Sequence, residues 1–217
     1  MFSVPKHVVI LCHPNPDSFN AAVAERYCAV VREIGQEVVL RDLYEMKFDP
    51  VLKSTERPGS ADYSVSADVA HELDLLAGIS VLVLIYPIWF GSPPAMLKGY
   101  VERVLGSGFS HQAVRARAHH RLQGTHMLSL TSSGTTQQWL EEQSAWMSLR
   151  LVFDRYLEHA FSLASADHIH FSAVVSGLKS SDVDGHLEEV RQAARKVSSI
   201  VLSEHHRQAS ATQPEGI

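Results

Sequence analysis

Cysteine is scarce in this sequence, because only Cys12 and Cys28 are present and no CxxC pair occurs. Two isolated cysteines exclude a disulfide framework and suit the reducing cytoplasm, where we expect the protein to be located. No apolar run approaches the roughly 20 residues that a membrane-spanning helix needs. The N-terminus also lacks the apolar core of a signal peptide. We therefore expect no insertion into a membrane.

Clustered basic residues are also lacking. The formal net charge is -5, and only Arg115, Arg117 and Arg121 approach a basic cluster. The sequence therefore has no electrostatic footprint for nucleic acid. Of the 13 histidines, only His168 and His170 would share one face of a strand, and no third ligand is spaced to join them. We predict neither a nucleic-acid partner nor a bound metal ion, and we interpret the histidines as solvated.

Two glycine-rich phosphate-binding patterns are missing as well. Neither GxGxxG nor the Walker loop occurs, so nothing predicts the nucleotide-binding fold of classical dehydrogenases or an NTPase. The 217 residues, 45% of them hydrophobic, suffice for one well-filled domain. We expect this domain to span residues 1–204 and the polar residues 205–217 to form a disordered tail.

What the sequence does contain is a regular alternation of apolar runs with helical periodicity. The run VLVLIY at 81–86 is apolar throughout, which is typical of a parallel strand buried on both faces. The alternation predicts an α/β fold with a five-stranded parallel sheet in the order 2-1-3-4-5 and helices on both faces. The expected strands are 7–12, 37–40, 81–86, 125–131 and 167–175. The expected helices are 18–34, 67–77, 92–105, 149–163 and 184–202, the third capped by Ser92.

The loop after the first strand carries donors that suit a phosphate. Its sequence, HPNPDSFN, places His13, Ser18 and Asn20 beside the N-terminus of the next helix. The positive end of a helix and its free N–H groups favour an anion. An ordinary turn capped by Ser18 or Asp17 is the alternative interpretation.

The loops after the third and fourth strands have different characters. Residues 87–90 (PIWF) are too apolar for ordinary solvated surface, so either a flat ligand or a neighbouring domain or subunit is expected to cover them. Residues 131–134 (TSSG) are small and polar, and Gly134 lets backbone N–H groups approach a ligand closely. A plain solvent-exposed loop is the alternative for this segment.

A parallel sheet brings these loops together, because ligands bind outside the carboxyl ends of its strands where the strand order reverses. A flavin needs a phosphate site, an apolar wall for its ring, and donors for the ring edge that gains charge on reduction. The three loops together therefore predict a flavin site. The polar residues 45–66 form a long loop, which we expect to cover that site.

The same segments resemble a known family. HPNPDSFN, YPIWFGSPPAMLKGYVERVL and LTSSG are similar to segments of the NAD(P)H:quinone oxidoreductases, a flavodoxin-like family that includes modulator-of-drug-activity reductases and potassium-efflux ancillary proteins. The similarity covers residues 7–200. It implies a flavodoxin-like three-layer sandwich, a flavin, and a homodimer in which the partner subunit walls the acceptor pocket. It assigns the phosphate arm of the flavin to His13, Ser18, Phe19 and Asn20. It assigns the isoalloxazine ring to Pro87, Ile88, Trp89 and Phe90, and the polar edge of that ring to Thr131, Ser132, Ser133 and Gly134.

This chain departs from the family in the fourth-strand loop and after it. Ser133 replaces a glycine, while Trp139 and Ala145 fall near the Tyr and His that assist hydride transfer in the mammalian-type enzymes. Ser133 and Trp139 are candidate pocket residues, and no catalytic side chain is assigned. The segment before the third strand is shorter than in those enzymes, which favours FMN, with FAD as the alternative.

The expected activity is a ping-pong reduction, in which NADH or NADPH delivers a hydride to the flavin and leaves before a quinone or similar acceptor takes two electrons. Stacking on Trp89 and Phe90 would orient the ring, and donors of residues 131–134 would stabilise its charge. Two alternatives remain. One is a flavodoxin-like carrier of single electrons, and the other is a flavin-binding regulatory partner of a membrane transporter.

Overall fold

All seven residues of strand β3 (Val81–Pro87) are buried, and β3 lies at the centre of a five-stranded parallel sheet in this computed structural model. The structure describes residues 4–109 and 120–211. The strand order is β2-β1-β3-β4-β5, as predicted. The other strands are β1 (Lys6–Leu11), β2 (Glu37–Asp42), β4 (His126–Ser132) and β5 (Ser165–Phe171).

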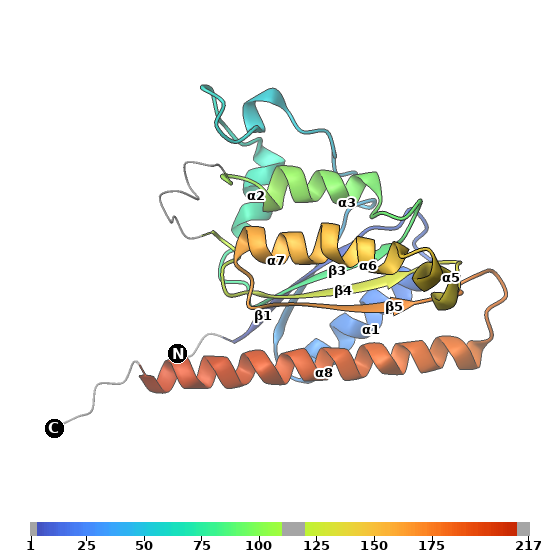
Figure 1. Cartoon of the computed structure of the whole chain (residues 1–217). Helices are drawn as coiled ribbons and strands as arrows, with labels where there is room; N and C mark the ends of the chain where they lie inside the picture. Colours follow the sequence, from blue (N-terminus) through green and yellow to red (C-terminus); the bar gives the residue numbers. More distant parts are fainter. Residues whose placement is uncertain (1–3, 110–119, 212–217) are drawn as a thin grey trace.

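Helices cover both faces of the sheet, which gives the three layers seen in Figure 1. One face carries α1 (Phe19–Glu33) and α8 (Ser180–Ala211). The opposite layer contains α2 (Ala67–Leu75), α3 (Ala95–Tyr100), α6 (Ala145–Leu149) and α7 (Arg155–Phe161), with π-helical stretches η2 (Val101–Leu105) and η3 (Arg150–Asp154). The remaining elements are the 3-10 turn η1 (Ser54–Glu56) and α5 (Gln137–Glu142). None of the helices in the described ranges combines the length and apolarity needed to cross a bilayer.

The side chains of β3 alternate between two hydrophobic cores. Val83 packs in the core beneath α1 and α8, whereas Leu84 packs in the core beneath α3 and α7. Because helices cover both faces of this strand, both sets of side chains must be apolar. This explains the unbroken apolar run that the sequence shows at this position.

The segment predicted as one helix at 149–163 consists of the end of α6, then η3 and α7. A π-helical turn holds more residues than an α-helical turn, so it rotates the side chains that follow. Asp154 is fully buried as a result, while Leu151 and Val152 of the same stretch are exposed. A periodicity of 3.6 residues per turn does not predict this arrangement.

Two predicted boundaries were wrong for local reasons. Ser92 does not cap a helix, because it pairs with Trp89 in a short bridge and α3 begins only after Pro94. Strand β5 ends at Phe171 instead of residue 175, and Ala173 shortly after it has a φ of 55°, outside the extended region.

The C-terminal helix extends further into the polar C-terminal segment than expected. Helix α8 continues to Ala211, so residues 205–211 are helical where a disordered tail was predicted, and the expected boundary at 204 falls inside the helix. Two side-chain contacts hold α8 near the expected boundary. Glu204 pairs with His126 at 3.0 Å, and His205 bonds the Ser80 hydroxyl at 3.1 Å. Residues 212–217 lie outside the described part of the chain.

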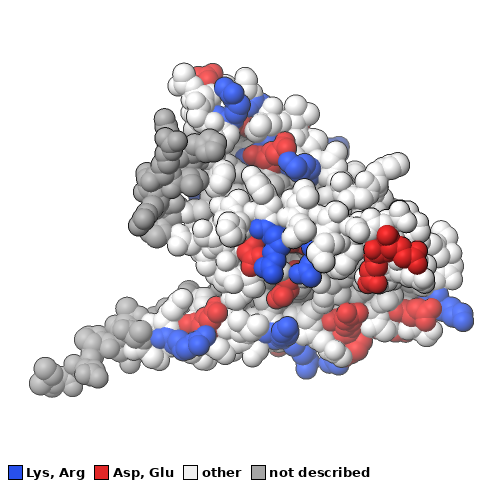
Figure 2. All heavy atoms as spheres, in the orientation of Figure 1, with Lys and Arg blue, Asp and Glu red and all other residues white. Residues whose placement is uncertain are grey.

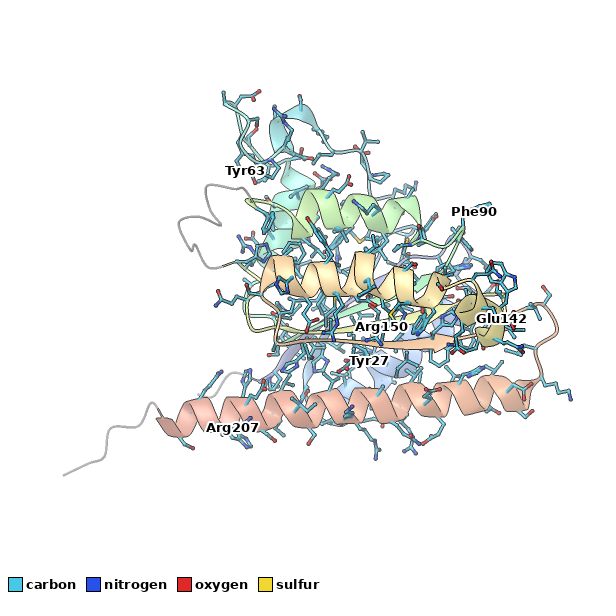
Figure 3. All side chains as sticks on the ribbon, viewed as in Figure 1. Tyr27, Tyr63, Phe90, Glu142, Arg150 and Arg207 are labelled. Atoms are coloured by element: carbon cyan, nitrogen blue, oxygen red, sulfur yellow. The ribbon has the colours of Figure 1, made fainter. Side chains whose placement is uncertain are left out.

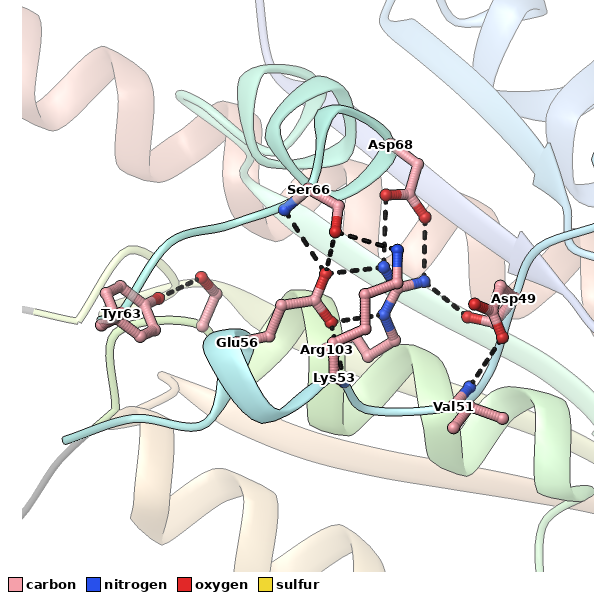
Figure 4. Close-up of polar contacts among 9 residues, drawn as sticks. Asp49, Val51, Lys53, Glu56, Tyr63, Ser66, Asp68 and Arg103 are labelled. Carbon is pink, nitrogen blue, oxygen red and sulfur yellow. Dashed lines mark hydrogen bonds and ion pairs between the residues drawn. The ribbon is translucent and has the colours of Figure 1, made fainter. Parts of the chain in front are cut away.

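The long loop between β2 and α2 does not cover the carboxyl ends of the strands. Residues 49–66 rise above α2 and η2, away from those ends (Figure 1). Arg103 of η2 holds the loop through an ion pair with Glu56 at 2.7 Å (Figure 4). In Figure 3, Tyr63 of this loop and Phe90 lie on opposite sides of the upper helical layer. The expectation that this loop covers the site was therefore wrong.

Charged side chains are spread over the face shown in Figure 2, where acidic and basic groups lie interspersed. Arg121 is exposed, and its guanidinium donates to the Leu73 carbonyl at 3.2 Å. Arg115 and Arg117, the other members of the weak basic cluster, lie outside the described residues.

Candidate active site at the carboxyl ends of the strands

The three loops that the sequence selects meet at one edge of the sheet. Strands β1, β3 and β4 are neighbours, so their carboxyl ends lie side by side. The ring of His13 lies 5.8 Å from the ring of Trp89, which joins the first loop to the second. The Ile88 N–H donates to the Ser132 carbonyl at 2.7 Å, which joins the second loop to the third. The Ser132 hydroxyl donates to the Asn20 side chain at 2.7 Å and closes the ring of contacts.

The N-terminus of α1 points free donors at this edge. Ser18 caps the helix, because its hydroxyl oxygen accepts from the Ala21 N–H at 3.2 Å. The N–H groups of Phe19 and Asn20 have no partner among the described residues. His13 is fixed beside them, since its Nδ1 accepts from the Asn15 N–H at 3.1 Å. These donors, with the positive end of a 15-residue helix, form an environment that favours an anion.

Two residues of the phosphate set take part differently from the way the motif suggests. The Phe19 ring packs against the rings of Phe171 at 5.4 Å and His186 at 5.7 Å, away from the other loops. Only its backbone N–H is available at the edge. The Asn20 side chain is buried, and its oxygen is held by Ser132. Asn20 therefore also fixes the distance between α1 and β4.

The loop after β3 makes a tight turn that exposes an aromatic ring. Trp89 and Ser92 exchange two backbone hydrogen bonds of 3.0 Å, and the φ angles of Phe90 and Gly91 between them are 50° and 74°. Two consecutive positive φ values define a type I′ turn, which Asn-Gly adopts readily and Phe does not. Phe90 is fully exposed (108%) and projects from the rim, as Figure 3 shows, while Trp89 is half-buried.

The loop after β4 offers fewer backbone donors than expected. The Ser133 N–H donates to the Phe171 carbonyl at 3.0 Å, so it continues the pairing with β5. The N–H groups of Gly134 and Thr135 make no hydrogen bond with the described part of the chain, which leaves them for a ligand. Trp139 lies on α5, half exposed, and its N–H is bonded to the Thr136 cap at 3.3 Å.

The hydroxyls of Thr131 and Ser133 bond two histidines of β5, and of the two residues only Ser133 keeps some exposure to solvent (7%). Thr131 Oγ1 lies 2.6 Å from Nε2 of His168 and 2.9 Å from Nδ1 of His170. Ser133 Oγ lies 3.0 Å from Nε2 of His170. Thr131 is completely buried, so its side chain cannot contact a ligand directly. The structure thus places these two predicted site residues in a polar network beneath the edge.

Sequence reasoning missed this network. The side chains of His168 and Asp154 are fully buried and lie 2.5 Å apart, and the ring of Trp146 packs on His168 at 4.6 Å. Burial, followed by the nearby His168, lowers the pKa of His170 to about 4. The interpretation of these histidines as solvated was therefore wrong. The alternation His-x-His was the available signal, but nothing in the sequence revealed that Asp154 would cover that face.

A hollow of about 350 Å³ lies elsewhere, between β4, β5 and α8. Its lining includes Asp167, Glu189 and Lys196, and none of the predicted site residues contributes to it. Their exposed charged groups face solvent. The hollow is separate from the edge where the three loops meet.

Comparison with known proteins identifies the family. The model of a family described as having a flavodoxin-like fold matches residues 5–197. The chain belongs to this family. An uncharacterized NAD(P)H oxidoreductase of Haemophilus influenzae is 34% identical to this flavodoxin-like protein over 130 residues, which cover 59% of this chain and 64% of that protein. NAD(P)H dehydrogenase (quinone) 1 of Cavia porcellus is 30% identical over 129 residues, which cover 51% of this chain and 46% of that enzyme.

Solved structures agree with this assignment. The NAD(P)H:quinone oxidoreductase from Methanothermobacter marburgensis superimposes with a TM-score of 0.75 at 25% identity, covering 90% of this chain and 96% of that one. An FMN-dependent NADH-azoreductase from Bacillus anthracis, solved with FMN, shares the fold with a TM-score of 0.67 at 13% identity, over 89% of this chain and 99% of that one. The resemblance to quinone oxidoreductases that the motifs indicate is confirmed. The chain spans only about half to two thirds of the length of the curated relatives it matches.

Proposed function

We propose that this protein is a flavin-dependent NAD(P)H oxidoreductase that reduces quinones or similar acceptors by two electrons in a ping-pong reaction. The observation that carries the proposal is the convergence of three chemically different loops at one edge of the sheet. The ring contact between His13 and Trp89 and the hydrogen bond between Asn20 and Ser132 hold that convergence. The names of the similar proteins support the same activity.

The donor set at this edge fits a flavin. The phosphate would lie at the N-terminus of α1, held by the Phe19 and Asn20 N–H groups and by His13, with Ser18 ordering the turn. Ring atoms would pack on residues 87–90, chiefly on Trp89. The free N–H groups of Gly134 and Thr135 would bond the polar edge of the ring, while Thr131, Ser132 and Ser133 support that loop from beneath.

A bound flavin would supply the hydride chemistry that no side chain of this edge can supply. The protein would bind a nicotinamide nucleotide and then the acceptor in the same place, against Trp89 and Phe90. Trp89 would orient each reactant by stacking, because holding the reacting atoms in the correct geometry raises the rate. We propose FMN as the cofactor, with FAD as the alternative. The cytoplasmic location expected from the two free cysteines stays a prediction.

The first experiment tests flavin binding and turnover together. The purified protein should be yellow, release FMN on heating, and oxidise NADH or NADPH only when an acceptor such as menadione is present. Initial rates at several acceptor concentrations should give parallel double-reciprocal lines. A colourless protein that binds neither FMN nor FAD at micromolar concentration would overturn the proposal. A yellow protein without turnover would favour the electron carrier or the regulatory partner.

A pair of variants tests the phosphate site. Ser18→Asp and Ser18→Asn both retain an N-cap for α1, but only the aspartate adds a negative charge where the phosphate would bind. We expect about tenfold weaker FMN binding for Ser18→Asp than for Ser18→Asn, because like charges repel at the helix N-terminus. Equal thermal midpoints would show that the fold is intact. Equal affinities would place the phosphate elsewhere.

We also propose a homodimer, because helices α6, η3 and α7 present an exposed apolar face. Met147, Leu151, Val152 and Tyr156 are 57–77% exposed on consecutive turns. Contiguous exposed apolar side chains mark interfaces. Sedimentation of Leu151→Glu should show monomers, whereas Leu202→Glu on α8 should remain dimeric. A wild-type protein that sediments as a monomer at micromolar concentration would contradict the dimer.

A further inference from the structure

We propose that Asp154, His168, Thr131, His170 and Ser133 form a proton relay that serves acceptor reduction at the carboxyl edge of the sheet. The inference rests on the proposed function for its substrate, and on the observed side-chain network for its residues. Of the relay residues, only Thr131 and Ser133 belong to the loop sequences that predict the flavin site. The relay begins at a buried carboxylate and ends one residue before the free N–H of Gly134.

Hydrogen-bond distances join the five groups without a gap. Asp154 Oδ2 lies 2.5 Å from His168 Nδ1, and His168 Nε2 lies 2.6 Å from Thr131 Oγ1. Thr131 Oγ1 lies 2.9 Å from His170 Nδ1, and His170 Nε2 lies 3.0 Å from Ser133 Oγ. Each distance is short enough for proton transfer between heavy atoms. Asp154 and the His168 ring are closed to solvent, so a proton reaching them travels along the chain.

With Asp154 ionised and His170 singly protonated, the hydrogen-bonding capacity of the groups allows two arrangements of protons. The Asp154 carboxylate accepts, so His168 Nδ1 must donate to it. Thr131 has one hydroxyl proton and two imidazole neighbours, so it donates to one of them and accepts from the other. In the first arrangement Thr131 donates to His168, His170 Nδ1–H donates to Thr131, and the Ser133 hydroxyl donates to His170 Nε2.

The second arrangement contains one more proton. His168 is then doubly protonated and donates from Nε2 to Thr131, Thr131 donates to His170 Nδ1, and His170 Nε2–H donates to Ser133. The Ser133 hydroxyl now donates to the Thr135 carbonyl, which lies 3.1 Å away. A proton that arrives at Ser133 Oγ therefore appears on His168 after three short transfers, and the reverse sequence delivers it back to Ser133. In both arrangements, each of the four contacts that link the relay residues is a hydrogen bond.

The neighbouring groups assign the extra proton of the second arrangement to His168. Tyr86 of β3 is neutral, because burial, followed by the charge of Asp154, raises the pKa of its hydroxyl. Burial keeps His170 neutral as well, since its pKa is about 4. Arg150 lies four residues before Asp154 and keeps a fixed positive charge. His168 is the member of the relay that contacts the Asp154 carboxylate, at 2.5 Å, so a proton on His168 lies beside a negative charge.

The reaction needs such a supply. Reduction of a quinone follows the balance NAD(P)H + H⁺ + quinone → NAD(P)⁺ + hydroquinone, so the hydride accounts for two electrons and one hydrogen. The second hydrogen is a proton that forms an O–H bond on the acceptor oxygen. It leaves Ser133 Oγ, which is refilled from His168 through His170 and Thr131. Trp139 and Ala145 carry no group that could donate this proton.

NMR of the histidine side chains tests the relay without enzymatic turnover. In ¹⁵N-histidine NMR of the full chain, the two arrangements require His170 to change from the Nδ1–H to the Nε2–H tautomer at the pH where His168 gains its second proton. We expect this coupled change in the wild type and in Thr131→Ser, and its loss in Thr131→Val. A His170 tautomer that does not change as His168 titrates would overturn the relay.

A kinetic test uses acceptors that differ in their need for protons. Menadione takes a proton with its electrons, whereas ferricyanide takes electrons alone. The ratio of the menadione rate to the ferricyanide rate should fall at least tenfold in Thr131→Val and in His168→Gln, and should recover in Thr131→Ser. The pH dependence of menadione reduction should flatten in the two impaired variants. Equal ratios in Thr131→Val and Thr131→Ser would overturn the proposal.

A matched control lies at the other end of the same two strands. His126 is bonded to Ser165 at 2.9 Å and to Glu204 at 3.0 Å, so it resembles His168 in its partners but lies at the amino-terminal end of β4. His126→Gln should leave the ratio of rates unchanged. Failure of the proposed function is distinguishable, because a protein that binds no flavin would still display the coupled tautomers of His168 and His170.

Discussion

Two buried carboxylates on the same side of the sheet have partners of different chemistry. Glu56 is paired with Arg103 at 2.7 Å, and Asp154 is paired with His168 at 2.5 Å. Neither carboxylate is accessible to solvent. The first pair lies between the long loop and η2 (Figure 4), whereas the second joins η3 to β5 beneath the edge where the three loops converge.

The difference between the partners separates a structural cluster from a titratable one. Arg103 is permanently charged, and its guanidinium donates to Glu56, to Asp68 and to the Asp49 carbonyl, all within 3.2 Å. Such a cluster fixes geometry and exchanges no proton near neutral pH. Histidine is the side chain whose ordinary charge change lies closest to neutral pH, so a carboxylate paired with a histidine can take part in proton transfer.

The largest effect should follow from breaking the arginine cluster. Arg103→Met leaves the buried Glu56 without its positively charged partner, and we expect the free energy of unfolding in urea to fall by about 3–5 kcal/mol. The control is Lys98→Met, which breaks an exposed ion pair with Glu102 and should cost less than about 1 kcal/mol. If both variants lost the same amount, the buried cluster would not be holding the loop.

On acidification, the two clusters should lose their contributions to the free energy of unfolding in different pH ranges. Burial lowers the pKa of His170 to about 4 from 6.5, so the unfolded chain binds its proton first, and stability falls as the pH drops from 6.5 to 4. The hydrogen bonds from Arg103 lower the pKa of Glu56 from 4.5 to about 2, so its contribution is lost between pH 4.5 and 2.

Each group should contribute on the order of 2 kcal/mol to the unfolding free energy over its own window. Urea titrations at steps of pH test this. His170→Asn should flatten the upper window, and Glu56→Gln should flatten the lower one. His7 also has a pKa lowered by burial, to about 4, so part of the upper slope should survive in His170→Asn. A single slope that neither variant changes would contradict the separation.

A glycine on α3 tests how closely the arginine-held loop must pack. A Cβ added at Gly99 would lie 2.3 Å from the Pro50 carbonyl oxygen, so the loop would have to move. We expect Gly99→Ala to destabilise the protein by about 2 kcal/mol, measured by thermal unfolding. Gly185→Ala in α8 meets nothing within 4 Å and should raise stability by about 0.5–1 kcal/mol. Stability changes of opposite sign in the two variants would show that the loop held by Arg103 packs tightly on Gly99. A Gly99→Ala variant as stable as the wild type would show that it does not.

The smallest effect concerns the turn at the rim. Phe90→Asn should relieve the strain of a positive φ and stabilise the protein by about 1 kcal/mol, while raising the KM for the acceptor because an apolar contact is lost. Ser162→Gly relieves a similar strain at the end of α7, where φ is 53°, and should leave the KM unchanged. An unchanged KM in Phe90→Asn would remove Phe90 from the acceptor site.

The sequence determined the sheet, its strand order and the three loops, because these depend on local patterns. The run at 81–86 must be buried on both faces, and residues after parallel strands must share an edge. The same reasoning placed His13, Trp89 and Ser132 together without coordinates.

Only the tertiary structure decided which partner each buried polar group would meet. A period of two puts His168 and His170 on one face of β5, but it does not reveal what covers that face. The π-helical turn η3 supplies Asp154, and its register follows from packing across the sheet instead of from the local sequence. The direction of the Phe19 ring and the attachment of the long loop to Arg103 likewise depend on residues distant in the chain. Local patterns determine which residues share a face, and long-range packing determines what that face touches.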